Sequence, residues 1–198
     1  MKELVVSVAG TGGQGVLSAA RLLGEAGFRR GLAVAVSQLH GMSQRGGSVE
    51  SSVCFNGDGI LPSSSSVDVL IGLELFEALR ASSRLGKGSI ALINPWLAVP
   101  PGTRLSLAVV PSAEEVMSTL RERAEVHVVE ANAIATELGS RAAANLAMLG
   151  AFCAASGVID PKDVLEAIER VGTLRMRSIA QLALALGYEA FARARASA

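Results

Sequence analysis

Cysteine and histidine are both scarce in this chain of 198 residues, which has two of each. Cys54 and Cys153 lie far apart and form no C-x-x-C pair. The chain therefore offers neither clustered thiolates for an iron–sulfur cluster nor a dithiol redox motif. We expect each cysteine to be a buried hydrophobic residue, and we expect His127, which alternates with valines, to lie in a strand. No spacing of metal-ligating residues predicts a metal site.

Charged residues are also few. They make up 18% of the chain and the formal net charge is zero, which indicates no nucleic-acid partner and no anionic membrane surface. Soluble domains have about 25% charged residues, so we expect some apolar surface to be covered in an oligomer. No apolar run reaches the ~18 residues of a membrane-spanning helix, because Asn145 interrupts the longest run, at 142–155. The first apolar run is too short for a signal peptide, which predicts a cytoplasmic protein.

Glycine, by contrast, is abundant, and three glycines follow the first apolar run. Gly10, Gly12 and Gly15 have the spacing G-x-G-x-x-G, between a predicted buried strand at 4–8 and a predicted helix at 13–29. In this pattern the first glycine permits a tight turn and the second lets the backbone approach a ligand. The third allows close helix–strand packing, and the helix N-terminus favours an anion. Tight packing alone and contact with a cofactor both account for these glycines.

The residues after this motif do not favour NAD. An NAD site needs an acidic residue about 20 residues further on, and that count ends near Ala35, where there is no carboxylate. Ser37 with Arg45 would suit a 2′-phosphate, so an NADP-linked reductase stays open as an alternative. Gln14 is polar at the mouth of the helix without an evident structural need, which favours contact with a ligand.

A second motif occupies residues 37–48, with the sequence Ser-Gln-Leu-His-Gly-Met-Ser-Gln-Arg-Gly-Gly-Ser. It lies at the expected carboxyl edge of the sheet, where open α/β sheets bind ligands. A polar surface loop explains its glycines and serines, whereas a docked surface better explains Met42 and the Gln-Arg-Gly-Gly group. Arg45 suits a carboxylate or phosphate. His40 is a candidate for proton transfer because histidine titrates near neutral pH, but the sequence supplies no partner to orient it.

Apolar runs alternate with helix-like segments along residues 1–130. This alternation predicts a Rossmann-like α/β fold, with a mostly parallel sheet and crossover helices. Residues 131–198 carry only helical patterns, and we expect them to pack on the α/β core within a single domain, 1–198. The expected strands are 4–8, 32–37, 48–55, 67–73, 88–94, 105–110 and 126–129. The expected helices are 13–29, 75–80, 113–123, 131–138, 141–156, 161–171 and 176–195.

Several of these elements carry more detailed expectations. Alternation at 48–55 predicts a strand with one exposed face. Ser112 with Glu115 resembles a capping box, and Asp160-Pro161 suits a helix start. The helix at 141–156 is apolar all round, so it is buried either in the core or against another subunit. The first helix is expected to face the sheet through Val16, Leu17, Ala20, Leu23 and Gly27. A solvated face is expected for Arg175, Arg177, Arg193 and Arg195.

Together, the two glycine-rich motifs resemble the gamma subunit or domain of 2-oxoacid:ferredoxin oxidoreductases. The form His-Gly-Met-x-Gln-Arg-Gly-Gly is most similar to the small (beta) subunits of indolepyruvate ferredoxin oxidoreductases. The likeness continues at 72–74, at 77–80 and in Asn145-x-x-x-Leu149-Gly150-Ala151. It departs at Gly139-Ser140-Arg141, where the family often has Gly-Asn, and residues after Val171 do not align.

This resemblance implies a division of labour in a hetero-oligomer. Thiamine diphosphate, magnesium and the [4Fe–4S] clusters belong to a large catalytic (alpha) subunit, and none is bound by this chain alone. The assembly converts a 2-oxoacid, here indolepyruvate or another aryl pyruvate, to acyl-CoA and passes electrons to ferredoxin. The chain is then an accessory subunit that is inactive in isolation, with coenzyme A as a shared ligand. The residues expected at the shared site are Gly10, Gly12, Gly13, Gln14, Gly15, Ser37, Gln38, His40, Gln44, Arg45, Gly46 and Gly47.

Two other interpretations are kept beside this one. The chain is either the NADP-linked reductase described above or a non-catalytic interaction module whose glycine loops serve packing only. Gly57-Asp58-Gly59 copies the start of a thiamine diphosphate motif, but a single aspartate is a poor magnesium site. Because Asn-Gly and Asp-Gly favour turns, we interpret this segment as a hairpin turn.

Overall fold

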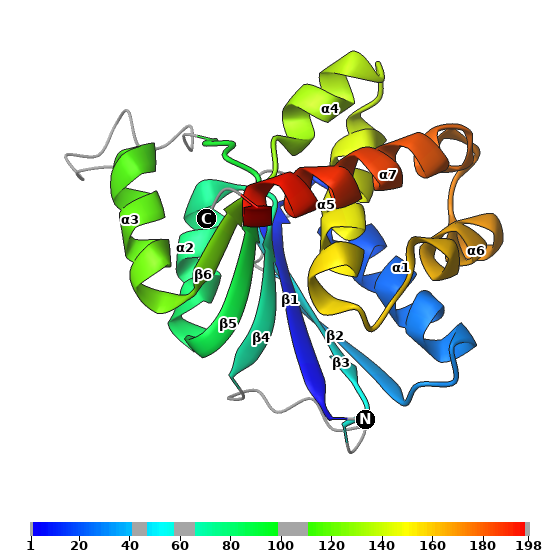
Figure 1. Ribbon diagram of the computed structural model, residues 1–198, viewed down its shortest axis with the longest axis horizontal. Helices are drawn as coiled ribbons and strands as arrows, with labels where there is room; N and C mark the ends of the chain where they lie inside the picture. Colours follow the sequence, from blue (N-terminus) through cyan, green and yellow to red (C-terminus); the bar gives the residue numbers. More distant parts are fainter. Residues whose placement is uncertain (1, 41–46, 58–65, 99–110, 197–198) are drawn as a thin grey trace.

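A six-stranded sheet lies between two layers of helices (Figure 1) in the computed structural model, which describes residues 2–40, 47–57, 66–98 and 111–196. The strand order is β2-β3-β1-β4-β5-β6. The strands are β1 (Leu4–Thr11), β2 (Val34–His40), β3 (Ser48–Phe55), β4 (Val67–Gly72), β5 (Leu85–Ile93) and β6 (Glu125–Val128). The helices are α1 (Val16–Arg29), α2 (Leu75–Ala81), the 3-10 turn η1 (Ser82–Arg84), α3 (Ala113–Arg123), α4 (Ala131–Glu137), α5 (Arg141–Ser156), α6 (Pro161–Val171) and α7 (Leu174–Ala196).

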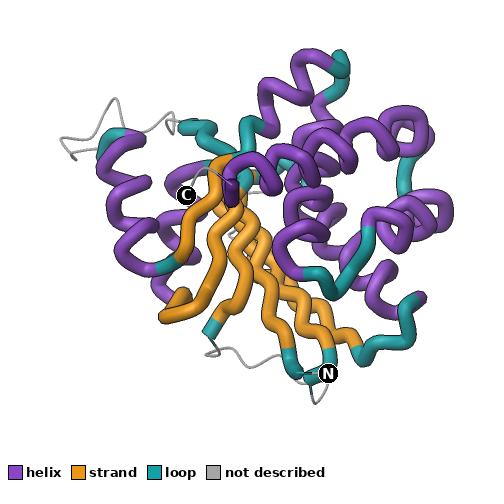
Figure 2. The backbone as a smooth tube through the Cα atoms, in the orientation of Figure 1, coloured by secondary structure: helices purple, strands orange, loops and turns teal. Residues whose placement is uncertain are grey.

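Helices cover both faces of this sheet (Figure 2). Helices α1, α5, α6 and α7 form one layer, and α2 and α3 form the other. Strand β1 is therefore buried on both sides and mostly apolar, as is usual for a central strand covered on both faces. Val6 and Val8 pack in the α1 layer, whereas Val5 and Ala9 pack in the α2 layer. The expected Rossmann-like α/β fold with a mostly parallel sheet is confirmed, and so is the placement of His127 in a strand. The expected strand at 105–110 lies outside the described residues.

One strand breaks the parallel arrangement. Strand β3 runs antiparallel to both neighbours, β1 and β2. Only residues 41–47 connect β2 to β3, which is too short for the crossover helix that parallel neighbours need. The prediction of an exposed face on this strand is wrong, since Ser51–Phe55 are all buried. Helix α1 covers one side, with Gly27 leaving room for the Phe55 ring, and an ion pair between Arg84 and Glu50 lies on the other.

The prediction for helix α1 needs two corrections. It begins at Val16 rather than residue 13, because Gly13 and Gly15 have left-handed backbones with φ of 99° and 83°. Leu17 is 36% exposed and does not face the sheet. The buried stripe instead follows Val16, Ala19/Ala20, Leu23 and Ala26/Gly27, the i, i+3/i+4 positions of one helix face.

Helix α5 is buried within this chain, which decides between the two expectations for it. Residues 145–153 are all buried, and α7 packs against their outer side. The two helices approach closely because two glycines face carbonyl groups. A Cβ at Gly150 would overlap the carbonyl of Leu184, and one at Gly187 would overlap the carbonyl of Ala147. No helix in the described part of the chain is long and apolar enough to cross a membrane.

Local capping signals define other helix starts. Ser112 and Glu115 form the predicted capping box of α3, and Asp160 caps α6 with Pro161 in the first turn. The capping carboxylates of α6 also bind Arg30, at the end of α1: Asp160 lies at 2.5 Å and Asp163 at 2.7 Å from its Nη1. The hydrogen bond to Asp160 is the largest cause of a raised pKa of Arg30, and the hydrogen bond to Asp163 is the next. They tie α6 to α1 across the surface.

The glycine contacts between α5 and α7 predict a stability defect. Gly187→Ala should lower the free energy of unfolding by about 3 kcal/mol, because the new methyl group meets backbone that cannot move aside. Urea denaturation of the purified chain would measure this. Gly86→Ala is the matched control, since nothing lies within 4 Å of its added Cβ. Its urea concentration at the midpoint of unfolding should stay near that of the unsubstituted chain. Equal midpoints for the two variants would contradict the packing.

The buried cysteines predict slow thiol chemistry. Both are buried as expected, at 2% and 3% exposure, and burial raises the pKa of the Cys153 thiol to about 12. At pH 8 the folded protein should react with a disulfide reagent at Cys153 at least ~100-fold more slowly than the unfolded chain, because the thiolate is the nucleophile. Kinetics of thiol labelling with and without urea would test this. Equal rates would contradict it.

Candidate functional site

A cavity of about 610 Å³ opens where strands β1, β4 and β5 end. The crossover after β1 lies in one helix layer and the crossover after β4 lies in the other, so this is the switch point at which open α/β sheets bind ligands. The loops after the three strands form one side of the crevice, and α4, the start of α5 and the start of α7 form the other. The first glycine motif is therefore at the site, as its spacing suggests.

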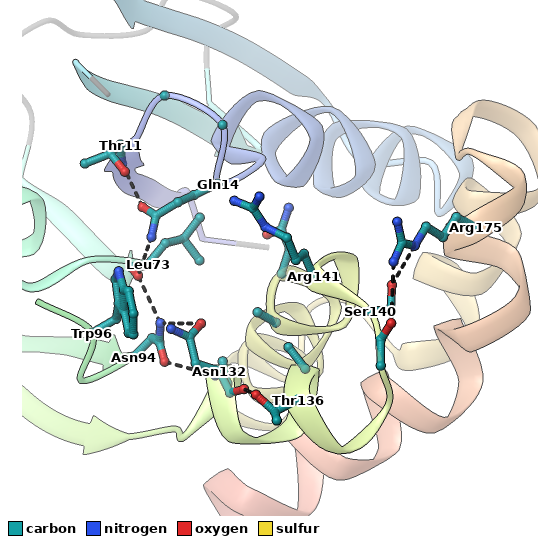
Figure 3. A pocket seen from close by; sticks show the side chains of 17 residues that line it. Thr11, Gln14, Leu73, Asn94, Trp96, Asn132, Thr136, Ser140, Arg141 and Arg175 are labelled. Atoms are coloured by element: carbon teal, nitrogen blue, oxygen red, sulfur yellow. Dashed lines mark hydrogen bonds between the residues drawn. The ribbon is translucent and has the colours of Figure 1, made fainter. Parts of the chain in front are cut away.

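Gln14 holds the two adjacent loops together (Figure 3). Its Oε1 accepts a hydrogen bond from the Thr11 amide at 2.7 Å, and its Nε2 donates to the Leu73 carbonyl at 3.2 Å. The side chain lines the crevice and also closes the turn after β1 against the end of β4. The interpretation that Gln14 lacks a structural need is wrong, because both ends of its amide are used within the chain.

The glycines of the first motif have different tasks. A Cβ at Gly10 would come within 2.8 Å of the Gln14 Oε1, and one at Gly15 within 2.6 Å of the Asn145 Nδ2. These two positions serve close packing. Gly13, in a left-handed conformation, lies at the crevice with no atom within 4 Å of a Cβ position. Gly12 also lines the crevice, and its amide donates to the Gly47 carbonyl at 2.8 Å, which brings the two motifs together.

Asn145 provides an unsatisfied acceptor in the crevice wall. Its Nδ2 donates to the Gly15 carbonyl at 2.8 Å. Its Oδ1 is buried without a hydrogen-bond partner, and the residue as a whole is only 5% exposed. A buried polar atom left unpaired costs free energy, so a ligand or water that donates a hydrogen bond at this point is favoured.

The charged groups of the crevice are cationic. Arg141 and Arg175 line it, and none of the described lining residues is a carboxylate. Arg175 donates to the Ser140 Oγ at 3.1 Å and to the Gly139 carbonyl at 3.4 Å, and Arg141 extends from the first turn of α5 toward the opposite loop (Figure 3). Helix α5 has no acidic residue in its first turn and no side-chain cap, so its free amides add positive potential. The site suits an anion.

The other predicted site residues lie apart from this crevice. Ser37 and Gln38 pair with Ser52 and Ser51 of β3, one strand removed from β1, and Gln38 lines a different groove. The backbone of His40 pairs with Val49. Gln44, Arg45 and Gly46 lie outside the described residues, as does Asp58 of the predicted hairpin turn. Because β3 stands between β1 and β2, the end of β2 is displaced from the position that reads a dinucleotide ribose.

Several lining residues were not predicted from the sequence. Asn94 donates to the Leu73 carbonyl at 3.0 Å and to the Asn132 Oδ1 at 3.3 Å, and Trp96 stands half exposed beside them. A polar residue directly after a buried strand was the available signal for Asn94. Arg175, expected on a solvated face, is exposed but belongs to the crevice wall. No local pattern indicates that the start of α7 lines the same crevice as the β1 loop.

Comparison with known proteins gives a consistent family. Residues 5–194 match the model of pyruvate ferredoxin/flavodoxin oxidoreductase. The chain is 36% identical to indolepyruvate oxidoreductase subunit IorB of Pyrococcus horikoshii, covering 79% of this chain and 80% of that protein. The corresponding subunit of Archaeoglobus fulgidus is 35% identical over 94% of each chain. The gamma subunit of a keto/oxoacid ferredoxin oxidoreductase from Geobacter sulfurreducens has a similar fold, with a TM-score of 0.72 at 24% identity, covering 98% of this chain and 99% of that chain.

The contacts of Gln14 predict a structural cost for its removal. Gln14→Ala should destabilise the chain by about 2 kcal/mol, because the half-buried Thr11 amide loses its acceptor and the Leu73 carbonyl loses a donor. Ser18→Ala, on the exposed side of α1, is the control and should change stability by less than ~0.5 kcal/mol. Urea denaturation measures both. A Gln14→Ala chain as stable as the parent would show that this side chain does not hold the two loops together.

Proposed function

Because the chain belongs to the pyruvate ferredoxin/flavodoxin oxidoreductase family, we propose that it is the accessory subunit of an enzyme that oxidises indolepyruvate or a related aryl 2-oxoacid. The assembled enzyme releases CO₂ from the 2-oxoacid, joins the acyl group to the sulfur of coenzyme A and passes two electrons to ferredoxin. Two relatives at 35–36% identity carry the name indolepyruvate oxidoreductase subunit, which supports the choice of substrate class. The isolated chain has no turnover of its own.

The position of the two cysteines supports a partner that carries the redox centres. Cys54 packs in the α2 layer and Cys153 in the α1 layer, so the sheet separates the only thiols of the chain. A [4Fe–4S] cluster needs about four thiolates together. A large catalytic subunit therefore supplies the clusters, together with thiamine diphosphate and its magnesium ion.

The crevice is the part of this chain that meets a reactant, and its charge is the observation that carries the proposal. Coenzyme A is polyanionic, and its phosphates match Arg141, Arg175 and the free amides of α5. The Asn145 Oδ1 needs a donor, which a ribose hydroxyl or the adenine amino group provides. Trp96, 49% exposed at the rim, offers a ring on which the adenine stacks. Gly12 and Gly13 let the ligand come close to the backbone.

The second motif completes the contact surface in this proposal. The Gly47 carbonyl accepts a hydrogen bond from the amide of Gly12, which lines the crevice, so the described end of this motif lies at the crevice. His40, Gln44 and Arg45 then meet the large subunit or the bound coenzyme. The residues expected at the shared site, from Gly10 to Gly47, are proposed as contacts with the large subunit or the coenzyme. Gly10, Gly15 and Gln14 contribute indirectly, by fixing the shape of the loop.

Co-expression with the large subunit tests the division of labour. We expect indolepyruvate-dependent acyl-CoA formation from the complex and none from either chain alone, because each lacks part of the cleft. The assay follows acyl-CoA by chromatography and electron transfer by reduction of ferredoxin. Full activity from the large subunit without this chain would contradict the proposal.

Arginine substitutions test the coenzyme site. Arg141→Gln and Arg175→Gln should each raise the KM for coenzyme A by about tenfold, since each removes a charge-assisted hydrogen bond to phosphate. The KM for the 2-oxoacid should not change. Arg121→Gln, on the exposed side of α3, is the matched control and should leave both constants unaltered. Unchanged coenzyme A kinetics in the two crevice variants would place that ligand elsewhere.

A further inference from the structure

The two edges of the sheet differ in how they are protected. Strand β6 is four residues long, carries the charged Glu125 and has α7 packed beside it. Strand β2 has seven residues, Val-Ala-Val-Ser-Gln-Leu-His, with no proline, lysine or carboxylate. It ends the strand order, so its outer backbone has no partner strand among the described residues. Proteins ordinarily shorten, charge or cover such edges because they pair with other chains.

A groove lined by both apolar and charged side chains follows this unprotected edge. It has a volume of about 550 Å³ and lies between α1 and β2. Leu17, Arg21, Gly24 and Phe28 line it at i, i+4, i+7 and i+11, one face of α1. Phe28 is 69% exposed, Val36 42% and Leu17 36%. A pairing-competent strand beside exposed apolar side chains is typical of a protein interface rather than of free surface.

We propose that β2 pairs with β2 of a second copy of this chain, antiparallel and about a two-fold axis perpendicular to the sheet. An antiparallel edge is self-complementary under such an axis, as an isologous interface requires. The two sheets then form one continuous sheet, and the two α1 helices lie antiparallel on the same face of it. When Val36 lies opposite Val36 of the second copy, Val34 lies opposite Gln38 of that copy. The side chains of these residues point toward α1.

The charges on α1 fit the same axis. Gly24 lies directly against Val36, since a Cβ there would come within 2.8 Å of the valine Cγ2. An axis through Val36 therefore also passes beside the middle of α1. Arg21 and Glu25 lie on either side of this point and both line the groove. In antiparallel helices each Arg21 faces the Glu25 of the other copy, so one axis satisfies both the strand pairing and the charges.

Arg21 strengthens the case for a second copy over other occupants. It has no hydrogen bond or ion pair within the described part of the chain, although Glu25 is four residues away on its own helix. Glu25 instead lies 3.4 Å from the Nε of Arg170. A partner that covers the groove must supply a carboxylate opposite Arg21 and a strand with an uncharged edge. A second copy supplies both, with its Glu25 carboxylate shared between this Arg21 and the Arg170 of its own chain.

Disulfide trapping in the intact complex tests this pairing. Directly opposite residues of antiparallel strands are about 5 Å apart, within reach of a disulfide. After co-expression with the large subunit and mild oxidation, Val36→Cys should give a reducible band at twice the 20.3 kDa of the chain. Both native cysteines are buried. Leu182→Cys, on the exposed face of α7 at 53%, is the matched control and should stay at the mass of one chain.

A charge variant gives an independent readout. Arg21→Glu should weaken self-association in sedimentation by roughly tenfold, because it sets two carboxylates against each other across the axis. Arg121→Glu on α3 should not change it. A Val36→Cys band at the mass of one chain, or one joined to the large subunit, would overturn the proposal. The second of these results would assign the groove to the large subunit.

Discussion

One hydrogen bond fixes how the loop after β1 lies against the helical half of this protein. The amide of Asn145, on α5, donates to the carbonyl of Gly15, at the start of α1. The bond requires glycine, because the backbone there is left-handed, at φ 83°, and a Cβ would come within 2.6 Å of the amide nitrogen. Position 15, position 145 and the spacing between α1 and α5 are therefore set together. This contact holds the β1 loop against α5, and residues of both line the crevice.

Local signals in the sequence account for much of the fold. The helices α5 and α6 have the same first and last residues as predicted, and the capping boxes of α3 and α6 mark their starts. These features depend on residues within a few positions of one another. The position of the loop after β1, at the carboxyl edge of the sheet, is predictable for the same reason, since strand, glycines and helix are consecutive.

Long-range pairing accounts for what could not be predicted. The polar residues of β3 suggest exposure, yet the Ser7 hydroxyl donates to Glu50 at 2.6 Å, and Arg84 pairs with the same carboxylate. Burial lowers the pKa of Arg84, as expected for a cation removed from water. These three residues come from β1, β3 and η1, so no short segment of the sequence shows that they pair with one another. The crevice is similar, because Asn94, Arg141 and Arg175 meet only after the helical half has folded onto the sheet.

Helix α7 connects the crevice to the far edge of the sheet. Its first turn carries Arg175, and near its other end Phe191 packs on the ring of His127 of β6, with centroids 4.7 Å apart. Binding of a ligand to the Arg175 guanidinium is thermodynamically coupled to the packing of the whole helix on the sheet. Occupancy would then retard amide hydrogen exchange along α7 from Arg175 as far as Phe191, which packs on the strand that the helix covers. Slower exchange at this edge of the sheet would therefore report that the crevice is occupied.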